Sequence, residues 1–102
     1  MASSAKYLYF ILDSLSGICG ISYRAMMGEY IIYLNGKIVG GIYDDRFLVK
    51  PTKSAKTLMP DAPLDFPYEN AKPMLLCTAA RDREQMQKLI IGVYNDLYEK
   101  DR

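Results

Sequence analysis

The stretch "MMGEYIIYLNGKIVGGIYDDRF", residues 26–47, gathers three acidic side chains, an arginine and several glycines in a short apolar segment. Glu29, Asp44 and Asp45 are expected near one end of a hairpin, and paired carboxylates can bind a cation or act as general acid and base. Turn aspartates more commonly remain solvated and bond their own backbone. We therefore interpret these acids as structural, and we expect no enzyme, no bound metal and no cofactor.

The absence of histidine narrows the chemistry further. Ser-His-Asp and Cys-His nucleophiles, histidine metal sites and histidine acid–base catalysis are excluded. Cys19 and Cys77 lack metal-ligand spacing, so we expect two small buried thiols rather than a zinc site or a disulfide. The glycines of "GICG" and "VGGIY" do not follow a phosphate-binding pattern.

The length and the net charge of the chain limit its possible fold, its binding partners and its cellular compartment. The 102 residues are enough for one domain with a single core, spanning 1–102. A formal net charge of +1 gives no overall attraction to nucleic acid or anionic lipid. The longest apolar runs are far too short to span a bilayer, and the start "MASSAKYLYF" lacks the features of a signal peptide. We expect a cytoplasmic protein without a membrane segment.

Helical periodicity marks both ends of the chain. Ser3 and Ser4 are candidate caps for a helix over 4–15, which ends near Gly17. Asp82 and Gln85 are placed as a capping box for a final helix. Its apolar face consists of Met86, Leu89, Ile90, Val93, Tyr94 and Leu97.

Strand patterns fill the region between these helices. Strands are expected over 21–26 and on both sides of Asn35-Gly36, a strong signal for a two-residue hairpin turn. Continuous pairing from that turn would place Gly40 opposite Ile31 and Gly41 opposite Tyr30. A second reversal at Asp44-Asp45, or a longer loop that includes Arg46, returns the chain to Lys50.

The remaining segments complete an α+β prediction. Thr52 can cap a short helix through Leu58. Residues 74–78 are predicted to form a buried strand, with which the segment 66–69 pairs weakly. The predicted order is α-β-β-β-α-β-β-α, with one antiparallel sheet and helices packed on it.

The run "YRAMMGEYIIYLNGKIVGGIYDDRFLVKP" resembles the signature of the N-terminal domain of the TfoX/Sxy family of competence regulators. The shared order is Arg, Met-Gly, an aromatic-containing strand, Asn-Gly-Lys, a strand with small residues, Asp-Asp-Arg and a strand ending in Lys. The matching positions are Arg24, Met27, Gly28, Tyr30, Tyr33, Asn35, Gly36, Lys37, Asp44, Asp45, Arg46 and Lys50. The resemblance extends through both flanking helices and covers nearly the whole chain.

This resemblance implies a fold similar to the secretion chaperones and a cytoplasmic bacterial protein linked to regulation of competence genes for DNA uptake. Full-length regulators of the family carry a second, helical C-terminal domain. We expect that domain to be absent, because the sequence ends at Arg102, directly after the final helix. The family's role in transcription therefore transfers only weakly, and the motif residues are interpreted as mainly structural.

Three functions remain open. The favoured one is a non-enzymatic regulatory or protein-interaction domain, in which an uncovered sheet face or edge strand docks a protein partner or a second copy in a homodimer. The alternatives are nucleic-acid binding through surface Lys, Arg and Tyr, including the lysines of "KPTKSAK", and small-ligand binding between sheet and helices. The candidate partner-binding residues are Arg24, Glu29, Arg46 and Lys50.

Overall fold

The computed structural model describes residues 3–100. Its elements are α1 (Ala5–Ser14), β1 (Ile21–Met26), β2 (Glu29–Leu34), β3 (Lys37–Tyr43), β4 (Arg46–Val49), α2 (Lys53–Leu58), β5 (Leu64–Asp65), β6 (Met74–Leu76) and α3 (Arg83–Lys100). This order confirms the predicted α+β class. Four strands precede α2, one more than the predicted order counts, because the return through Phe47 forms the separate strand β4.

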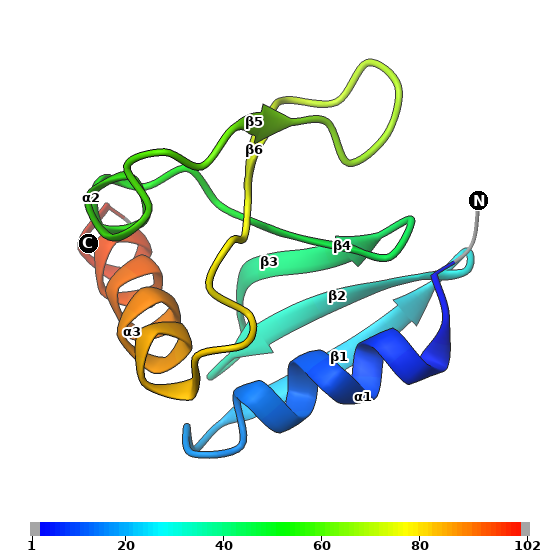
Figure 1. Ribbon diagram of the computed structural model, residues 1–102, viewed down its shortest axis with the longest axis horizontal. Helices are drawn as coiled ribbons and strands as arrows, with labels where there is room; N and C mark the ends of the chain where they lie inside the picture. Colours follow the sequence, from blue (N-terminus) through cyan, green and yellow to red (C-terminus); the bar gives the residue numbers. More distant parts are fainter. Residues whose placement is uncertain (1–2, 101–102) are drawn as a thin grey trace.

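A six-stranded antiparallel sheet is the centre of the fold (Figure 1). The strand order is β1-β2-β3-β4-β6-β5, so β1 to β4 follow as a meander and β6 pairs with both β4 and β5. β1 is an edge strand, and residues 22–26 are exposed. None of the helices within residues 3–100 is both long and apolar enough to cross a lipid bilayer.

Three two-residue turns connect the meander. They are Met27-Gly28, Asn35-Gly36 and Asp44-Asp45, and both residues of each turn have positive φ, between 50° and 84°. This is the type I′ geometry, whose twist matches that of the flanking strands. The Asn35-Gly36 hairpin is therefore confirmed. The Asp-Asp reversal takes the short form, because Tyr43 pairs directly with Arg46.

A β-bulge in β3 corrects the predicted register. Tyr33 pairs with Ile38 as expected, but Ile32 pairs with Gly40, so Val39 is an extra residue on the β3 side. Beyond the bulge Gly41 lies opposite Ile31 instead of Tyr30, and Gly40 no longer faces Ile31. The prediction of continuous pairing was wrong, because nothing in the apolar run "IVGGIY" identifies which residue is left out of the hydrogen-bond ladder between β2 and β3.

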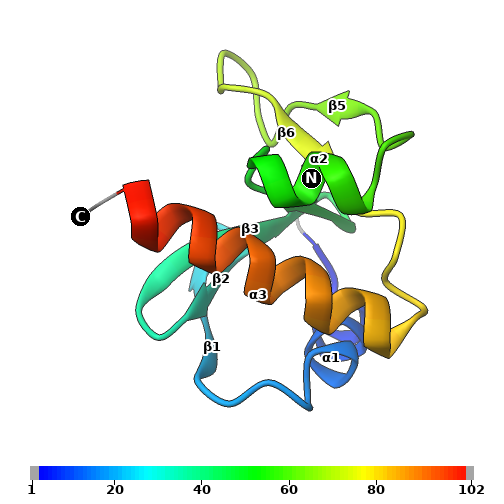
Figure 2. The ribbon, with the colours of Figure 1, turned by 90° about the vertical axis from the view of Figure 1, so that its left-hand side faces the viewer.

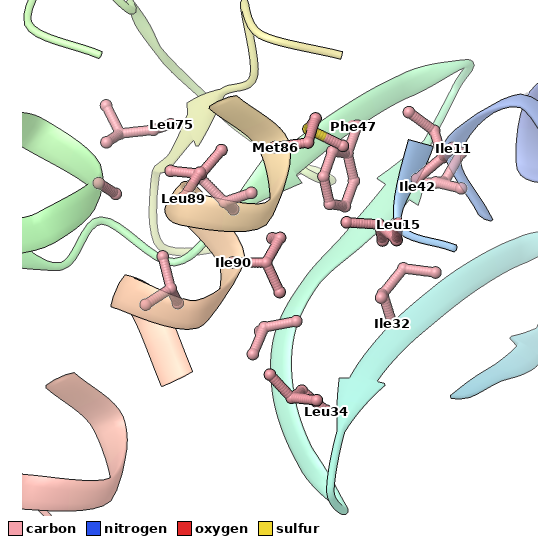
Figure 3. Close-up of a cluster of buried hydrophobic side chains, with 14 of the residues drawn as sticks. Ile11, Leu15, Ile32, Leu34, Ile42, Phe47, Leu75, Met86, Leu89 and Ile90 are labelled. Carbon is pink, nitrogen blue, oxygen red and sulfur yellow. The ribbon is translucent and has the colours of Figure 1, made fainter. Parts of the chain in front are cut away.

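The hydrophobic core lies on one face of the sheet. All three helices contribute to it, and α3 runs across the sheet beside β2 and β3 (Figure 2). Phe47 of β4 packs near Met86 of α3, and Ile42 lies near Ile11 of α1 (Figure 3). The fully buried strand residues of this core are Ile32, Val39, Ile42, Phe47 and Val49. Burying each such side chain contributes about 1.5–3 kcal/mol.

Helix caps agree with the sequence for the most part. The Ser4 Oγ accepts from the Tyr7 N–H, and the Thr52 Oγ1 accepts from the Ala55 N–H. The Asp82 carboxylate accepts from the Gln85 N–H at 3.1 Å, which is one half of the predicted capping box. The other half does not form, because the Gln85 side chain donates to the Leu58 carbonyl instead.

Two local predictions were wrong. The strand that pairs with β6 is Leu64–Asp65 rather than 66–69, because Leu64 and Asp65 already face Leu75 and Met74 before the chain turns away. Cys19 is exposed rather than buried, since it lies in the loop between α1 and β1, outside the core; Cys77 is half-buried. Burial raises the pKa of the Cys77 thiol.

The two glycines of β3 give a first prediction. A Cβ at Gly40 would lie 2.5 Å from the Leu48 carbonyl oxygen, which is backbone and cannot move freely, whereas the atoms nearest to a Cβ at Gly41 belong to the side chain of Tyr43. We expect Gly40→Ala to lower the free energy of unfolding by about 1–3 kcal/mol, the usual cost of overpacking. Gly41→Ala should lower the free energy of unfolding by less, because the Tyr43 side chain can rotate to make room for the new methyl group. Urea denaturation measures both, and an equal cost would contradict this account of the bulge.

Candidate functional site

The face of the sheet opposite the core carries a row of side chains that no helix within residues 3–100 covers, here called the outer face. Cross-strand pairing defines the row as Arg24, Ile31, Gly41, Leu48 and Leu76. Leu48 is fully buried although it lies outside the core cluster. Gly41 is also buried, and Ile31 and Leu76 are partly exposed, so the apolar row of the outer face is covered in part by side chains and loop rather than by a helix.

A groove of about 770 Å³ opens on this face. The β1–β2 and β3–β4 turns lie at the same side of the molecule, and the segment after β5 folds above them (Figure 1). The lining residues are Met26, Met27, Glu29, Ile31, Tyr43, Asp44, Arg46, Pro67 and Tyr68. The groove is thus mostly apolar, with two carboxylates and one guanidinium among its polar groups.

Two tyrosines line the groove. The Tyr43 ring lies back over Gly41, since a Cβ there would be 2.6 Å from the ring. Its centroid lies 6.4 Å from that of Tyr68, with the rings tilted by 58°. Burial raises the pKa of the Tyr43 hydroxyl above its ordinary value. The ring of Tyr43 thus occupies the space above Gly41 on the outer face.

Arg46 fixes the wall formed by the segment after β5. Its guanidinium forms an ion pair with Asp65 at 2.6 Å, and it donates to the carbonyls of Tyr43 and Phe66. We call this set the clamp: Arg46, Asp65 and the two carbonyls. It joins the start of β4 to β5, so that Pro67 and Tyr68 are held beside the groove. Hydrogen bonding to Arg46 holds the pKa of the Asp65 carboxyl below its usual range.

Glu29 joins the start of α1 to both turns beside the groove. Its Oε1 accepts from the Ser3 N–H at 2.8 Å, and its Oε2 accepts from the Asp44 N–H at 2.7 Å. The Ser3 Oγ accepts from the Asp45 N–H, and the Asp45 carboxylate accepts from the Ser4 N–H. We call these five residues the clasp. The prediction that Glu29 lies near the Asp-Asp turn is therefore confirmed.

The clasp gives Glu29 a structural explanation. Ser3 is buried, and its N–H donates both to Glu29 and to the Gly28 carbonyl, whereas the Asp44 N–H has the Glu29 carboxylate as its acceptor. Within residues 3–100 neither Glu29 nor Asp44 nor Asp45 forms an ion pair. The end of the groove next to the two turns is consequently acidic.

The structure brings only part of the predicted site together. Glu29 and Arg46 both line the groove. Arg24 lies on the outer face opposite Ile31 but outside the lining, and Lys50 follows the far end of β4. Within the described chain, no group of three or more Cys, Asp or Glu side chains is placed to hold a metal ion.

Sequence reasoning missed the apolar part of the groove. Tyr43 reaches the outer face only because of the bulge, and Tyr68 comes from a segment predicted as a weak strand. Ile31 lies on the outer face because side chains alternate along β2 and its neighbour Ile32 is in the core. One signal was available: a glycine two residues before a tyrosine on a strand, as in "GIY", leaves space for the ring on the same face. Nothing local places Pro67 over the sheet.

Comparison with known proteins gives one informative similarity. The chain is 33% identical over 72 residues to a protein of Spirochaeta aurantia described as an uncharacterised 12.7 kDa protein in the trpE 5' region. The match covers 71% of this chain and 63% of that protein, so the chain spans less than two thirds of its relative. No family model and no solved structure matches the chain.

The clasp gives a second prediction. Glu29→Gln replaces one accepting oxygen by an amide NH₂ group, which would face the N–H of Ser3 or of Asp44. We expect the free energy of unfolding to fall by about 0.5–1.5 kcal/mol, the net contribution of one hydrogen bond. The cost stays modest because Asp44 is exposed and the Ser3 N–H also donates to the Gly28 carbonyl. Glu99→Gln, on the exposed side of α3, is the matched control and should change little. Equal stability of the two variants in urea denaturation would mean that the clasp does not stabilise the fold.

The clamp gives a third prediction, on pH. Since the folded pKa of Asp65 is lowered, the clamp contributes its full stabilisation above the unfolded pKa, about 4, and loses it as the pH falls through the lowered folded value. The Phe66 amide, which donates to Asp65 Oδ1, reports this titration by NMR. Its midpoint should lie below the ordinary aspartate range and move up in Arg46→Gln. An unchanged midpoint would show that Arg46 does not hold the charge.

Proposed function

We propose that this chain is a non-enzymatic protein-interaction module that docks a partner protein in the groove of the outer face. The observation that carries the proposal is the largely apolar groove on the outer face, whose lining includes the exposed side chains of Met26, Met27 and Tyr68. Exposed apolar patches of this kind are typical of interaction sites. The edge strand β1 runs beside the groove, so a partner has both a groove and open backbone groups to use.

The exposure of individual side chains supports this proposal. Met27 is 97% exposed and Tyr68 66% exposed, and both line the groove. Methionine adapts its shape to different apolar partners, and tyrosine offers a large contact area that loses little side-chain entropy on binding. The clasp and the clamp hold the two sides of the groove in place, so binding costs less ordering of the protein itself.

The resemblance to the TfoX/Sxy N-terminal domain supports a regulatory role. In this proposal the partner is a component of gene regulation in a bacterial cytoplasm, and the chain acts on it by binding. The motif residues Met27-Gly28, Asn35-Gly36 and Asp44-Asp45 form the three turns, and Arg46 forms the clamp. The shared motif therefore maintains the shape of the groove.

Small-ligand binding is a second candidate, favoured by one observation. A volume of about 770 Å³ lies within the range of small-molecule sites, about 300–1,000 Å³. The groove lies on the outer face, not between sheet and helices as that hypothesis stated. A protein partner fits better, because most of a drug-sized ligand is normally enclosed by its pocket and this groove is open to solvent along the outer face.

The fourth prediction tests the proposed function directly. Met26→Glu introduces a charge into the groove wall, and Ile91→Glu introduces the same charge at a similarly exposed apolar position of α3. A photo-crosslinking side chain at Tyr68 should capture one partner in cells of the native host. Binding of that purified partner should fall at least about tenfold in Met26→Glu and stay unchanged in Ile91→Glu. Equal binding by both variants would place the interface elsewhere.

A further inference from the structure

We propose, building on the function above, that the groove binds an extended peptide segment of the partner that presents a lysine or arginine next to an apolar side chain. The inference follows from the distribution of charge and apolar surface within the groove. Apolar side chains, two carboxylates that form no ion pair within residues 3–100, and two tyrosine rings line the same groove. Each of these features corresponds to one part of such a peptide.

The apolar lining of the groove receives the partner's apolar residue. Met26, Ile31 and Pro67 contribute aliphatic surface from β1, β2 and the segment after β5. Because Arg24 and Ile31 face each other on the outer face, this apolar lining lies next to the edge strand. An extended peptide that pairs with β1 would project alternate side chains toward this face.

The two carboxylates, at the acidic end of the groove, supply the charge complementarity. The Glu29 carboxylate accepts only backbone and Ser3 hydrogen bonds, and the Asp44 side chain forms no hydrogen bond within residues 3–100. The one guanidinium in the groove is already neutralised, since Arg46 is paired with Asp65. A partner cation is therefore attracted to this end, where charge-assisted hydrogen bonds to carboxylates are strong.

The tyrosine pair adds a second attraction for a cation. Tyr43 and Tyr68 both line the groove that contains the two carboxylates. A Lys or Arg headgroup held between aromatic faces and carboxylates gains cation–π as well as Coulomb attraction. The same carboxylates repel phosphate groups, so nucleic acid is not the expected occupant of this face.

Met27 supports a binding role independently of charge. It has φ of +52° in its turn, a conformation that asparagine and glycine adopt easily and methionine does not. It is also almost completely exposed, so packing within the described chain does not explain the residue. Strained residues are often found at binding surfaces, and this position projects beside the groove.

The fifth prediction uses short synthetic peptides as probes, followed by the amide chemical shifts of the protein. Four peptides alternate leucine with lysine, leucine with glutamate, leucine with serine, and serine with lysine. The Leu/Lys peptide should bind at least about tenfold tighter than the other three and should shift the amides of the groove residues. Its advantage over Leu/Ser should shrink as salt is added, because the carboxylates are partly solvated.

Three variants identify the source of this preference. Asp44→Asn removes one of the two groove carboxylates while keeping a residue that tolerates positive φ, so the advantage of Leu/Lys over Leu/Ser should shrink clearly. Glu99→Gln is the matched control, since it removes one negative charge from the exposed side of α3, and it should keep that advantage. Met27→Asn should raise the thermal midpoint by relieving strain while weakening binding of both leucine peptides, a combination that a purely structural role for Met27 would not produce.

Several outcomes would overturn the inference. Equal binding of Leu/Lys and Leu/Ser would show that the groove does not recognise a cation. An unchanged preference for Leu/Lys in Asp44→Asn would show that the cation does not bind next to Asp44. If no peptide binds while Met26→Glu still abolishes partner binding, the proposed function stands and the peptide chemistry is wrong. If the groove is instead filled by a second copy, the protein will self-associate at low concentration and Met26→Glu will make it monomeric.

Discussion

The extra residue in β3 determines the arrangement of both faces of the sheet. In a regular strand, side chains alternate, so a residue that drops out of the ladder reverses the faces of everything that follows it. Here the bulge allows Ile42 to face the helices on the same side as Val39, and it places Tyr43 on the opposite side. Without it, Ile42 would lie on the outer face and the Tyr43 ring would compete with the core.

The charged residues of the central motif follow from this arrangement. Once the Asp44-Asp45 turn lies beside Met27-Gly28, the backbone N–H groups of Ser3, before α1, and of Asp44 converge on one place, and the Glu29 carboxylate accepts from both. Arg46 does the same for the carbonyls and the carboxylate on the other side of the groove. Charges that first suggest catalysis thus satisfy hydrogen bonds at the ends of strands.

The sequence predicts those structural features that depend on interactions between residues close together in the chain. Both long helices, the Ser4 and Thr52 caps and the Asn35-Gly36 hairpin were predicted because their chemistry acts over a few residues. The bulge was not predicted, because the segment "VGGI" permits several strand registers whose local free energies are nearly equal. The candidate site was predicted only through Glu29 and Arg46, because its other wall depends on how residues 66–68 fold back over the sheet.

The three short turns have a consequence for how the chain folds. Closing a two-residue turn costs little chain entropy, so β1 to β4 can pair progressively from any of the three turns. The contacts of Ser3 are different, because its partners are distant in the sequence. Glu29 lies 26 positions further along the chain and Asp45 lies 42 positions further. The meander is therefore expected to assemble early and α1 to attach late, so the acidic end of the groove acquires its final shape in the last stage of folding.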